Sequence, residues 1–250
     1  MDTMRPLILA IDTATPATGL AITRGTLIDG EVVASLGLSS NVTHSRRLLT
    51  SIDWLMAEVG IGWRDIDGIG VSIGPGSFTG LRIGMATAKG LAAAGGIKLL
   101  GVSTLDSLAA QCVSSQLVCS VLDARKKEVY AALYKRNDQN CLHMIGEISA
   151  LSPQELASRI DEPVVMVGDG LVVYREVFTE ILGDLLTIAP SALHEPSAAS
   201  LGLLCASLYL RNEFLDVGAA VPLYVRSSDA ELNLRRKQEA ALDATNRGVN

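Results

Sequence analysis

Apolar residues along this chain recur with two different periods. Alternating or continuous apolar runs of strand length predict β-strands, and apolar residues spaced three to four apart predict helices. In the stretch 43–59, for example, Leu48, Ile52, Leu55 and Val59 fall on one helical face. The first half of the chain is thereby predicted to hold strands over 6–12, 17–24 and 31–38, a helix over 43–59, a strand over 66–73, a helix over 79–94, a strand over 98–102 and a helix over 103–114.

The second half repeats this order of elements. Its pattern predicts strands over 117–123, 128–134 and 143–148, a helix over 153–160, a strand over 164–168, a helix over 171–182, a strand over 185–188 and a helix over 197–210. A duplicated α/β unit follows, with two lobes over 1–114 and 115–226, a cleft between them and a polar tail over 227–250. The order resembles the ribonuclease H-like unit of the actin, Hsp70 and sugar-kinase superfamily (ASKHA), in which the last helix can pack back on the first lobe. A coincidental match stays open, since α/β chains alternate strands and helices in any case.

Composition supports this fold class and limits where in the cell the protein is expected. Apolar residues make up 48% of the chain and aromatic residues only 4%, so we expect an aliphatic core of the kind found in layered α/β folds. The four cysteines lack a CxxC spacing, which indicates reduced thiols in a cytoplasmic protein. No apolar run approaches the ~18 residues that a membrane-spanning helix needs, so no membrane association is expected.

The net charge of −6 changes the expectation for nucleic acid. A protein that holds RNA by its own surface carries a basic footprint, which this chain lacks outside Arg235, Arg236 and Lys237 near its end. Any contact with tRNA is therefore expected only through a partner.

A glycine-rich segment over 74–82 joins a predicted strand to a predicted helix. It misses the Rossmann spacing by one residue, and Lys89 stands too far along the helix for a Walker loop. A tight structural turn is therefore favoured over a phosphate-binding loop.

Residues 70–74 match the sequence pattern of the serine-hydrolase nucleophile elbow. Ser72 falls inside the strand pattern, whereas an elbow serine needs the strand-to-helix turn, so a buried strand serine is favoured.

Carboxylates at the ends of two equivalent strands form a candidate ligand site. Asp12 and Asp123 each end the first strand of a lobe, and carboxylates facing a cleft hold Mg²⁺ or water in ATPases. Together with Thr13, Gly168 and Gly170 they make up the candidate nucleotide cleft. Asx turns and ordinary strand-ending loops explain the same residues without a ligand. No cluster has metal-ligand spacing, so neither a metal nor a cofactor is expected.

Two helices of the first lobe carry features of a contact surface. The helix over 79–94 places Gly80, Gly84 and two alanines in one row four residues apart, and glycine inside a helix costs ~1 kcal/mol relative to alanine. Such a row indicates very close packing. On the helix over 43–59, Trp54 lies opposite the apolar stripe, where tryptophan often anchors an interface. A partner protein and packing within the lobe both explain these features.

A family resemblance extends over nearly the whole chain. Its motifs are Leu9–Thr15, Gly74–Gly84, Gly101–Leu105, Asp123–Tyr130 and Pro222–Arg226. In order and spacing they resemble the TsaB (YeaZ) family, which takes part in making threonylcarbamoyladenosine in tRNA. The run Gly-Pro-Gly-Ser-Phe-Thr-Gly at 74–80 is the most specific of them.

The resemblance implies a non-catalytic subunit with protein partners. It would form a heterodimer with TsaD, the related subunit that transfers threonylcarbamoyl from an adenylate to tRNA adenosine, and TsaE, an ATPase, would join them. TsaD carries an H-x-x-x-H metal pair, whereas this chain has His44 and Leu48 at the matching helix, so the metal site is expected to be absent. Family members also self-associate through the partner surface when alone.

The implied partner surface lies on the two helices of the first lobe. Its candidates are Arg47, Ser51, Thr79, Arg82, Ile83 and Thr87 from the resemblance, with Trp54 and Gly84 from the spacing. Two other functions stay open on the residues alone. An ATP-dependent kinase or ATPase would use the candidate nucleotide cleft, and a protease would use Ser72 or Ser77.

Overall fold

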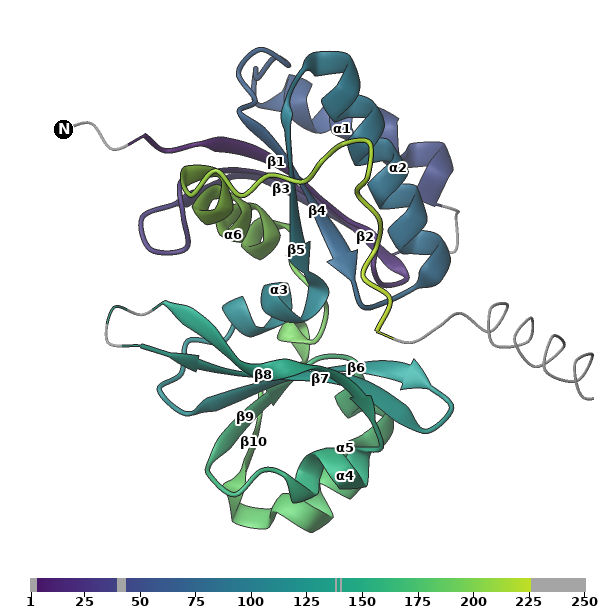
Figure 1. The fold of residues 1–250 in the computed structure, drawn as a ribbon, viewed down its shortest axis with the longest axis vertical. Helices are drawn as coiled ribbons and strands as arrows, with labels where there is room; N and C mark the ends of the chain where they lie inside the picture. Colours follow the sequence, from purple (N-terminus) through teal and green to yellow (C-terminus); the bar gives the residue numbers. More distant parts are fainter. Residues whose placement is uncertain (1–3, 40–43, 138, 140, 226–250) are drawn as a thin grey trace, which may run out of the picture.

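The chain folds into two lobes stacked one above the other (Figure 1). The computed structural model describes residues 4–39, 44–137, 139 and 141–225. The predicted polar tail over 227–250 and the first position of the helix predicted over 43–59 lie outside the described residues. Each lobe is built on a five-stranded mixed sheet.

The two sheets have the same topology. The first has the strand order β3-β2-β1-β4-β5 and the second, read in the same direction, β8-β7-β6-β9-β10. In each sheet the first three strands of the lobe form an antiparallel meander, and the next two join it in parallel. The strands are β1 (Leu7–Asp12), β2 (Ala17–Arg24), β3 (Glu31–Ser39), β4 (Gly68–Gly74), β5 (Lys98–Ser103), β6 (Leu117–Arg125), β7 (Glu128–Arg136), β8 (Leu142–Leu151), β9 (Val164–Val167) and β10 (Leu186–Ile188). This repeat confirms the predicted duplication and the ribonuclease H-like, actin-like fold class.

Two of the helices pack against the sheet formed by the other half of the chain. Two helices from the first half, α1 and α2, cover one face of the first sheet, while α6 from the second half covers its other face. The short helix α3 belongs to the first half but packs against β6 of the second sheet, whose other face is covered by α4 and α5. The helices are α1 (His44–Glu58), α2 (Phe78–Gly95), α3 (Thr104–Ala110), α4 (Pro153–Ser158), α5 (Gly170–Leu182) and α6 (Ala198–Leu210).

Helices on both faces explain the continuous apolar run of β1. All six residues of this central strand are buried, as expected for a strand that is covered on both sides. The α6 helix approaches the sheet very closely, because a Cβ added to Gly70 would lie 2.6 Å from Cys205 Sγ. The exchange of α6 therefore makes the second half of the chain part of the first lobe's core.

The last predicted helix of the first half ends early in the structure. The pattern over 103–114 predicts a helix that begins one residue earlier and ends four residues later than α3, which spans Thr104–Ala110. The Arg136 guanidinium donates hydrogen bonds to the carbonyls of Ala110 and Cys112, both at 3.1 Å. The Ala110 carbonyl is one of the acceptors that a helix end leaves free, and a side chain from β7 satisfies it together with the Cys112 carbonyl just beyond the helix.

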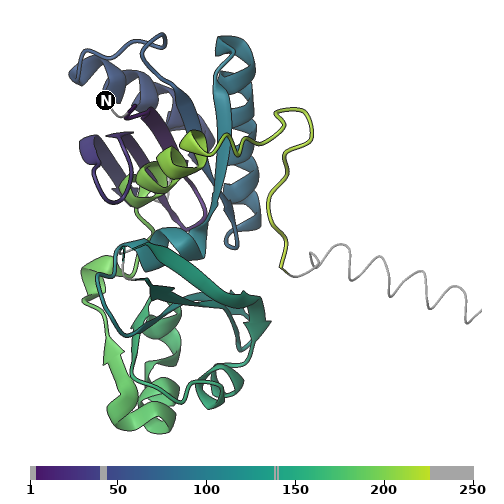
Figure 2. The ribbon, with the colours of Figure 1, turned by 60° about the vertical axis from the view of Figure 1, so that its left-hand side comes forward.

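The residues after α6 return along the first lobe. Figure 2 shows this segment running beside α2, and Figure 1 shows it crossing β5. The Leu215 N–H donates to the Leu99 carbonyl, and the Leu223 N–H donates to the Ile73 carbonyl. Lys89 Nζ on α2 donates to the carbonyls of Gly218 and Ala220 at 3.0 and 2.9 Å. We call residues 211–225 the C-terminal segment.

Among the described residues, no helix has both the length and the apolar character that crossing a membrane requires.

Candidate partner surface and inter-lobe cleft

The two helices on the outside of the first lobe expose most of the predicted partner residues. Trp54 of α1 leaves 52% of its surface open to solvent, although tryptophan in a folded lobe is usually well covered. Arg47 on α1 and Thr79 and Arg82 on α2 are also exposed. Three further candidates are half-buried, namely Ser51, Ile83 and Thr87. We call these seven residues the outer face.

Gly84 does not belong to the outer face, and its predicted place in the partner surface is wrong. Gly84 is buried, and a Cβ at this position would lie 2.3 Å from Thr13 Oγ1. A Cβ on Gly80 would lie 2.0 Å from the Thr13 carbonyl oxygen. The two glycines of the row on α2 therefore pack against the loop that follows β1. Of the two explanations left open by the spacing, packing within the lobe is the one that the structure supports.

Arg82 of the outer face takes part in an aromatic contact that the sequence pattern does not reveal. The Arg82 guanidinium lies 3.7 Å from the centre of the Phe78 ring, and Arg82 Nε donates to the Tyr224 hydroxyl at 3.1 Å. The rings of Phe78 and Tyr224 are 5.5 Å apart, and both are about two-fifths exposed. Stacking holds the charged group in one orientation at the surface. The only sequence signal was that Tyr224 falls in the family motif over 222–226.

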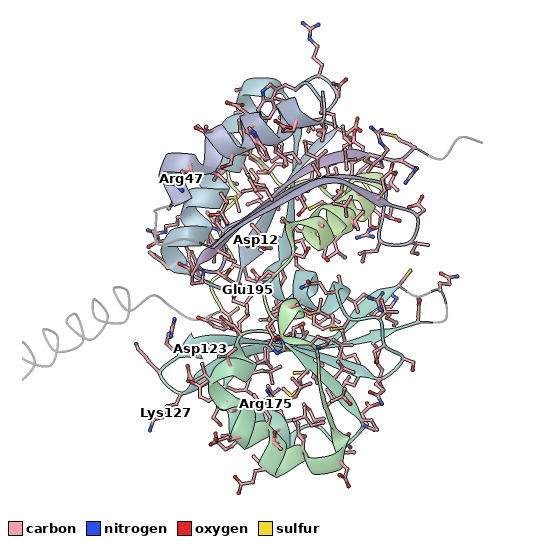
Figure 3. All side chains as sticks on the ribbon, turned by 180° about the vertical axis from the view of Figure 1, so that it is seen from behind. Asp12, Arg47, Asp123, Lys127, Arg175 and Glu195 are labelled. Atoms are coloured by element: carbon pink, nitrogen blue, oxygen red, sulfur yellow. The ribbon has the colours of Figure 1, made fainter. Side chains whose placement is uncertain are left out.

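A cavity of about 560 Å³ lies between the lobes. It is lined by the loop over 14–16, the start of α2, the end of β6 and the C-terminal segment. Of the five predicted cleft residues, Asp123 is the one in the described lining, together with Asp169, which lies between the predicted Gly168 and Gly170. Figure 3 shows Asp12 on the first lobe facing Asp123 on the second, with Glu195 between them.

The hydrogen bonds of Asp12 and Thr13 lie within the first lobe. Asp12 is buried, and its Oδ1 accepts the Ala14 N–H at 2.8 Å, which makes an Asx turn. Its Oδ2 has no hydrogen-bond partner among the described residues. Burial raises the pKa of the Asp12 carboxyl, and the hydrogen bond from Ala14 partly offsets this rise. The Thr13 hydroxyl donates to the Gly80 carbonyl at 2.7 Å. These bonds fix the loop after β1 on α2.

The second lobe uses its cleft carboxylates in the same way. Asp169 Oδ1 accepts the Asp123 N–H at 2.9 Å, and Asp123 Oδ1 accepts the Arg125 N–H at 2.9 Å. Asp123 Oδ2 also pairs with Arg125 Nη1 at 3.1 Å. Burial is the main cause that raises the pKa of Asp169. The carboxylates thus hold the end of β6 in place.

The two predicted cleft glycines have a packing role. A Cβ on Gly168 would lie 2.0 Å from the Val121 carbonyl oxygen, and one on Gly170 would lie 2.3 Å from Val121 Cγ1. Gly168 also has a φ of +124°, which is accessible mainly to glycine. Close approach of this turn to β6 therefore accounts for both glycines.

The other sequence candidates can also be placed. Ser72 is buried inside β4, which confirms the prediction of a strand serine rather than a nucleophile elbow. Ser77 caps α2, with its Oγ accepting the Gly80 N–H. Among the described residues, no three His, Cys, Asp or Glu side chains converge as metal ligands. Leu48 is buried in the core, and the His44 side chain lies outside the described part of the structure.

Comparison with known proteins is consistent across sequence and structure. The family model described as TsaD, tRNA N6-adenosine threonylcarbamoyltransferase, matches residues 39–234. The Bacillus subtilis and Escherichia coli proteins named tRNA threonylcarbamoyladenosine biosynthesis protein TsaB are each 30% identical, over 90% and 92% of this chain and 96% and 99% of theirs. YeaZ from Pseudomonas aeruginosa superposes with a TM-score of 0.73 at 28% identity, covering 88% of this chain and 99% of its own. This chain belongs to the TsaB (YeaZ) family, whose relatives cover nearly its whole length.

Proposed function

We propose that this chain is a non-catalytic subunit that pairs with TsaD, so that TsaD can transfer threonylcarbamoyl to an adenosine of tRNA. TsaE is the proposed third component. The names of the TsaB relatives support a role in this modification. The match to the TsaD family model supports TsaD as the partner, because related subunits commonly pair through equivalent surfaces.

One observation carries the proposal. The first lobe exposes Trp54 and the stacked group of Phe78, Arg82 and Tyr224, whereas the cleft carboxylates are engaged in bonds within their own lobes. Tryptophan, tyrosine and arginine are the residues that most often dominate the binding energy of an interface. The side chains best suited to binding a protein therefore lie on the outside of the first lobe, where a partner would cover them.

Titration calorimetry with TsaD from the same organism tests the pairing. We expect a 1:1 complex, and we expect Trp54→Ala to weaken it by at least about thirtyfold, the effect of losing a ~2 kcal/mol anchor. Trp63→Ala is the matched control, because Trp63 is also partly exposed, at 37%, but lies in the loop after α1. In the absence of TsaD, the same surface is proposed to pair two copies of the chain, which sedimentation would detect as a dimer weakened by Trp54→Ala.

Two outcomes would contradict the proposal. The first is a lack of association with TsaD, and the second is an equal loss of affinity for Trp54→Ala and Trp63→Ala. An equal loss would mean that the outer face is not the contact surface.

A nucleotide in the cleft is the competing function, and a specific observation favours it. The cavity of about 560 Å³ holds two carboxylates, Asp123 and Asp169, and Asp12 nearby has an oxygen without a hydrogen-bond partner in the described part of the chain. Binding of Mg²⁺-ATP by the isolated chain, lost in Asp12→Ala, would support an ATPase or kinase. Absence of ATP binding together with tight TsaD binding would support the subunit role.

A further inference from the structure

The hairpin between β6 and β7 has an unusual backbone. Three consecutive non-glycine residues have left-handed φ angles, namely 62° at Arg125, 55° at Lys126 and 64° at Lys127. Lys126 and Lys127 form the two-residue turn, flanked by the paired residues Arg125 and Glu128. A two-residue turn with positive φ at both positions is most easily made by Asn-Gly. We call residues 125–127 the hairpin tip.

Neighbouring groups hold the hairpin tip in this conformation. Asp123 accepts the Arg125 N–H and pairs with its guanidinium, and Asp169 in turn accepts the Asp123 N–H. Strained backbone of this kind persists where the surrounding structure fixes it, and it is found preferentially at functional positions. The lysines therefore occupy positions that Asn and Gly would fill at lower cost, which indicates that their side chains matter.

The hairpin tip concentrates positive charge at the surface of an acidic protein. The whole chain has a net charge of −6, yet all three tip residues are basic and exposed. The Arg125 side chain is 81% exposed, while its partner Asp123 is only 9% exposed, so the pair presents its cationic side to solvent. Exposed lysine and arginine at one point favour a phosphate oxygen as the ligand.

The position of the tip relates it to the proposed complex. In Figure 3, Lys127 projects from the second lobe on the same side of the molecule as Arg47 of the outer face, with Asp12 and Glu195 between the lobes. Arg125 also lines the cavity between the lobes. A partner bound to the outer face would thus lie on the side to which the tip points.

We propose that the hairpin tip contacts the phosphate backbone of the RNA that the complex modifies. This inference rests on the proposed pairing with TsaD. It departs from the expectation, drawn from the net charge of −6, that only a partner contacts tRNA, because two or three local phosphate contacts need no basic footprint over the whole surface. Each phosphate contact contributes about fivefold to affinity at roughly 0.15 M salt by release of counterions.

The experiment measures tRNA affinity of the full chain in complex with TsaD, over a range of salt concentrations. Three variants are compared, namely Lys126→Gln with Lys127→Gln, Lys126→Asn with Lys127→Gly, and Lys126→Arg with Lys127→Arg. Both neutral variants should bind tRNA about thirtyfold more weakly and reduce the slope of log affinity against log salt by about 2. The arginine variant should bind like the unsubstituted chain. The Asn-Gly variant should also melt at a higher temperature than the unsubstituted chain.

A matched control separates local contacts from net charge. The control variant, Arg24→Gln with Lys135→Gln, also removes two positive charges, but at strand ends far from the tip. There Arg24 pairs with Glu31, and Lys135 pairs with Glu162. This control should leave tRNA affinity within about twofold of the unsubstituted complex, because exposed ion pairs of this kind contribute little.

The outcomes are distinct. Unchanged tRNA affinity in both neutral variants, or an equal loss in the control, would overturn the inference. Loss of TsaD binding in the neutral variants would assign the tip to the protein partner and would also overturn it. Failure of the unsubstituted chain to bind TsaD would overturn the proposed function itself, and the inference with it.

Discussion

Replacing Gly84 by alanine tests how the small-residue row of α2 is used. The new Cβ would lie 2.3 Å from Thr13 Oγ1, which is too close for any real contact. Thr13 is buried and its hydroxyl donates to the Gly80 carbonyl at 2.7 Å, so it cannot move without breaking this bond. Either Thr13 rotates or α2 shifts away from the loop after β1.

The expected cost follows from these contacts. Loss of a buried hydrogen bond costs about 1–3 kcal/mol, and overpacking adds about 1–3 kcal/mol. Alanine recovers about 1 kcal/mol through its higher helix propensity. A net loss of about 3 kcal/mol would lower the melting temperature of a chain of this size by roughly 6–12 °C, which differential scanning calorimetry measures directly.

Gly90→Ala is the control on the same helix. A Cβ at Gly90 meets no atom within 4 Å, so helix propensity alone should raise the melting temperature by a few degrees. Adding Thr13→Ala to Gly84→Ala should recover at least ~1 kcal/mol relative to additivity, because the clashing oxygen is gone. If Gly84→Ala melted like the unsubstituted chain and lost TsaD binding, the packing argument would be refuted and Gly84 would return to the partner surface.

Three further predictions concern charge, thiol reactivity and the C-terminal segment. Asp12→Asn should raise the melting temperature at pH 7 but not at or below pH 3.8, which is the ordinary pKa of an aspartate carboxyl. The window in which the effect develops runs upward from pH 3.8. Burial raises the folded-state pKa of Asp12, so the unsubstituted chain loses stability as pH rises through that window, by about 1.4 kcal/mol for every tenfold increase in the proton affinity of the carboxyl on folding. Alkylation at pH 8 followed by mass spectrometry should modify the half-buried Cys141 first and Cys119 only after unfolding, since burial raises the pKa of the Cys119 thiol to about 12. Lys89→Met removes two bonds to the C-terminal segment and should speed hydrogen exchange of the Leu223 amide at least tenfold, with little change in melting temperature; unchanged exchange would show that Lys89 does not hold this segment.

The elements and their duplication could be predicted because their signals are local. The buried strand β1 reads as an unbroken apolar run, and α1 shows an apolar stripe at helical spacing. The same order of periods in both halves then determines the repeated topology. The early end of α3 could not be predicted in this way, since the group that satisfies its terminal carbonyl is Arg136 on the distant strand β7.

Only part of the candidate surface could be predicted, because some of its contacts join residues that are far apart in the sequence. Spacing on α2 indicated close packing at Gly84 but not the identity of the contact, which is Thr13 from a distant loop. The hydrogen bond from Arg82 to the Tyr224 hydroxyl joins residues that are 142 positions apart, and no local pattern encodes it. Exposure of Trp54, in contrast, follows directly from its position opposite the apolar stripe.

The difference between cleft and outer face has a physical basis that the sequence alone does not express. Thr13 and Asp123 already make hydrogen bonds inside their lobes, and a ligand that used these groups would have to break bonds worth about 1 kcal/mol each. Covering Trp54 and the ring of Phe78 breaks no hydrogen bond of either side chain within the described residues, and their burial gains about 25 cal/mol for each Å² of apolar surface removed from water. The same fold can support a ligand in the cleft or a protein on the outside. In this chain the side chains of the cleft stabilise the lobes, and those of the outer face remain available, which is why the proposed function lies on the surface of α1 and α2.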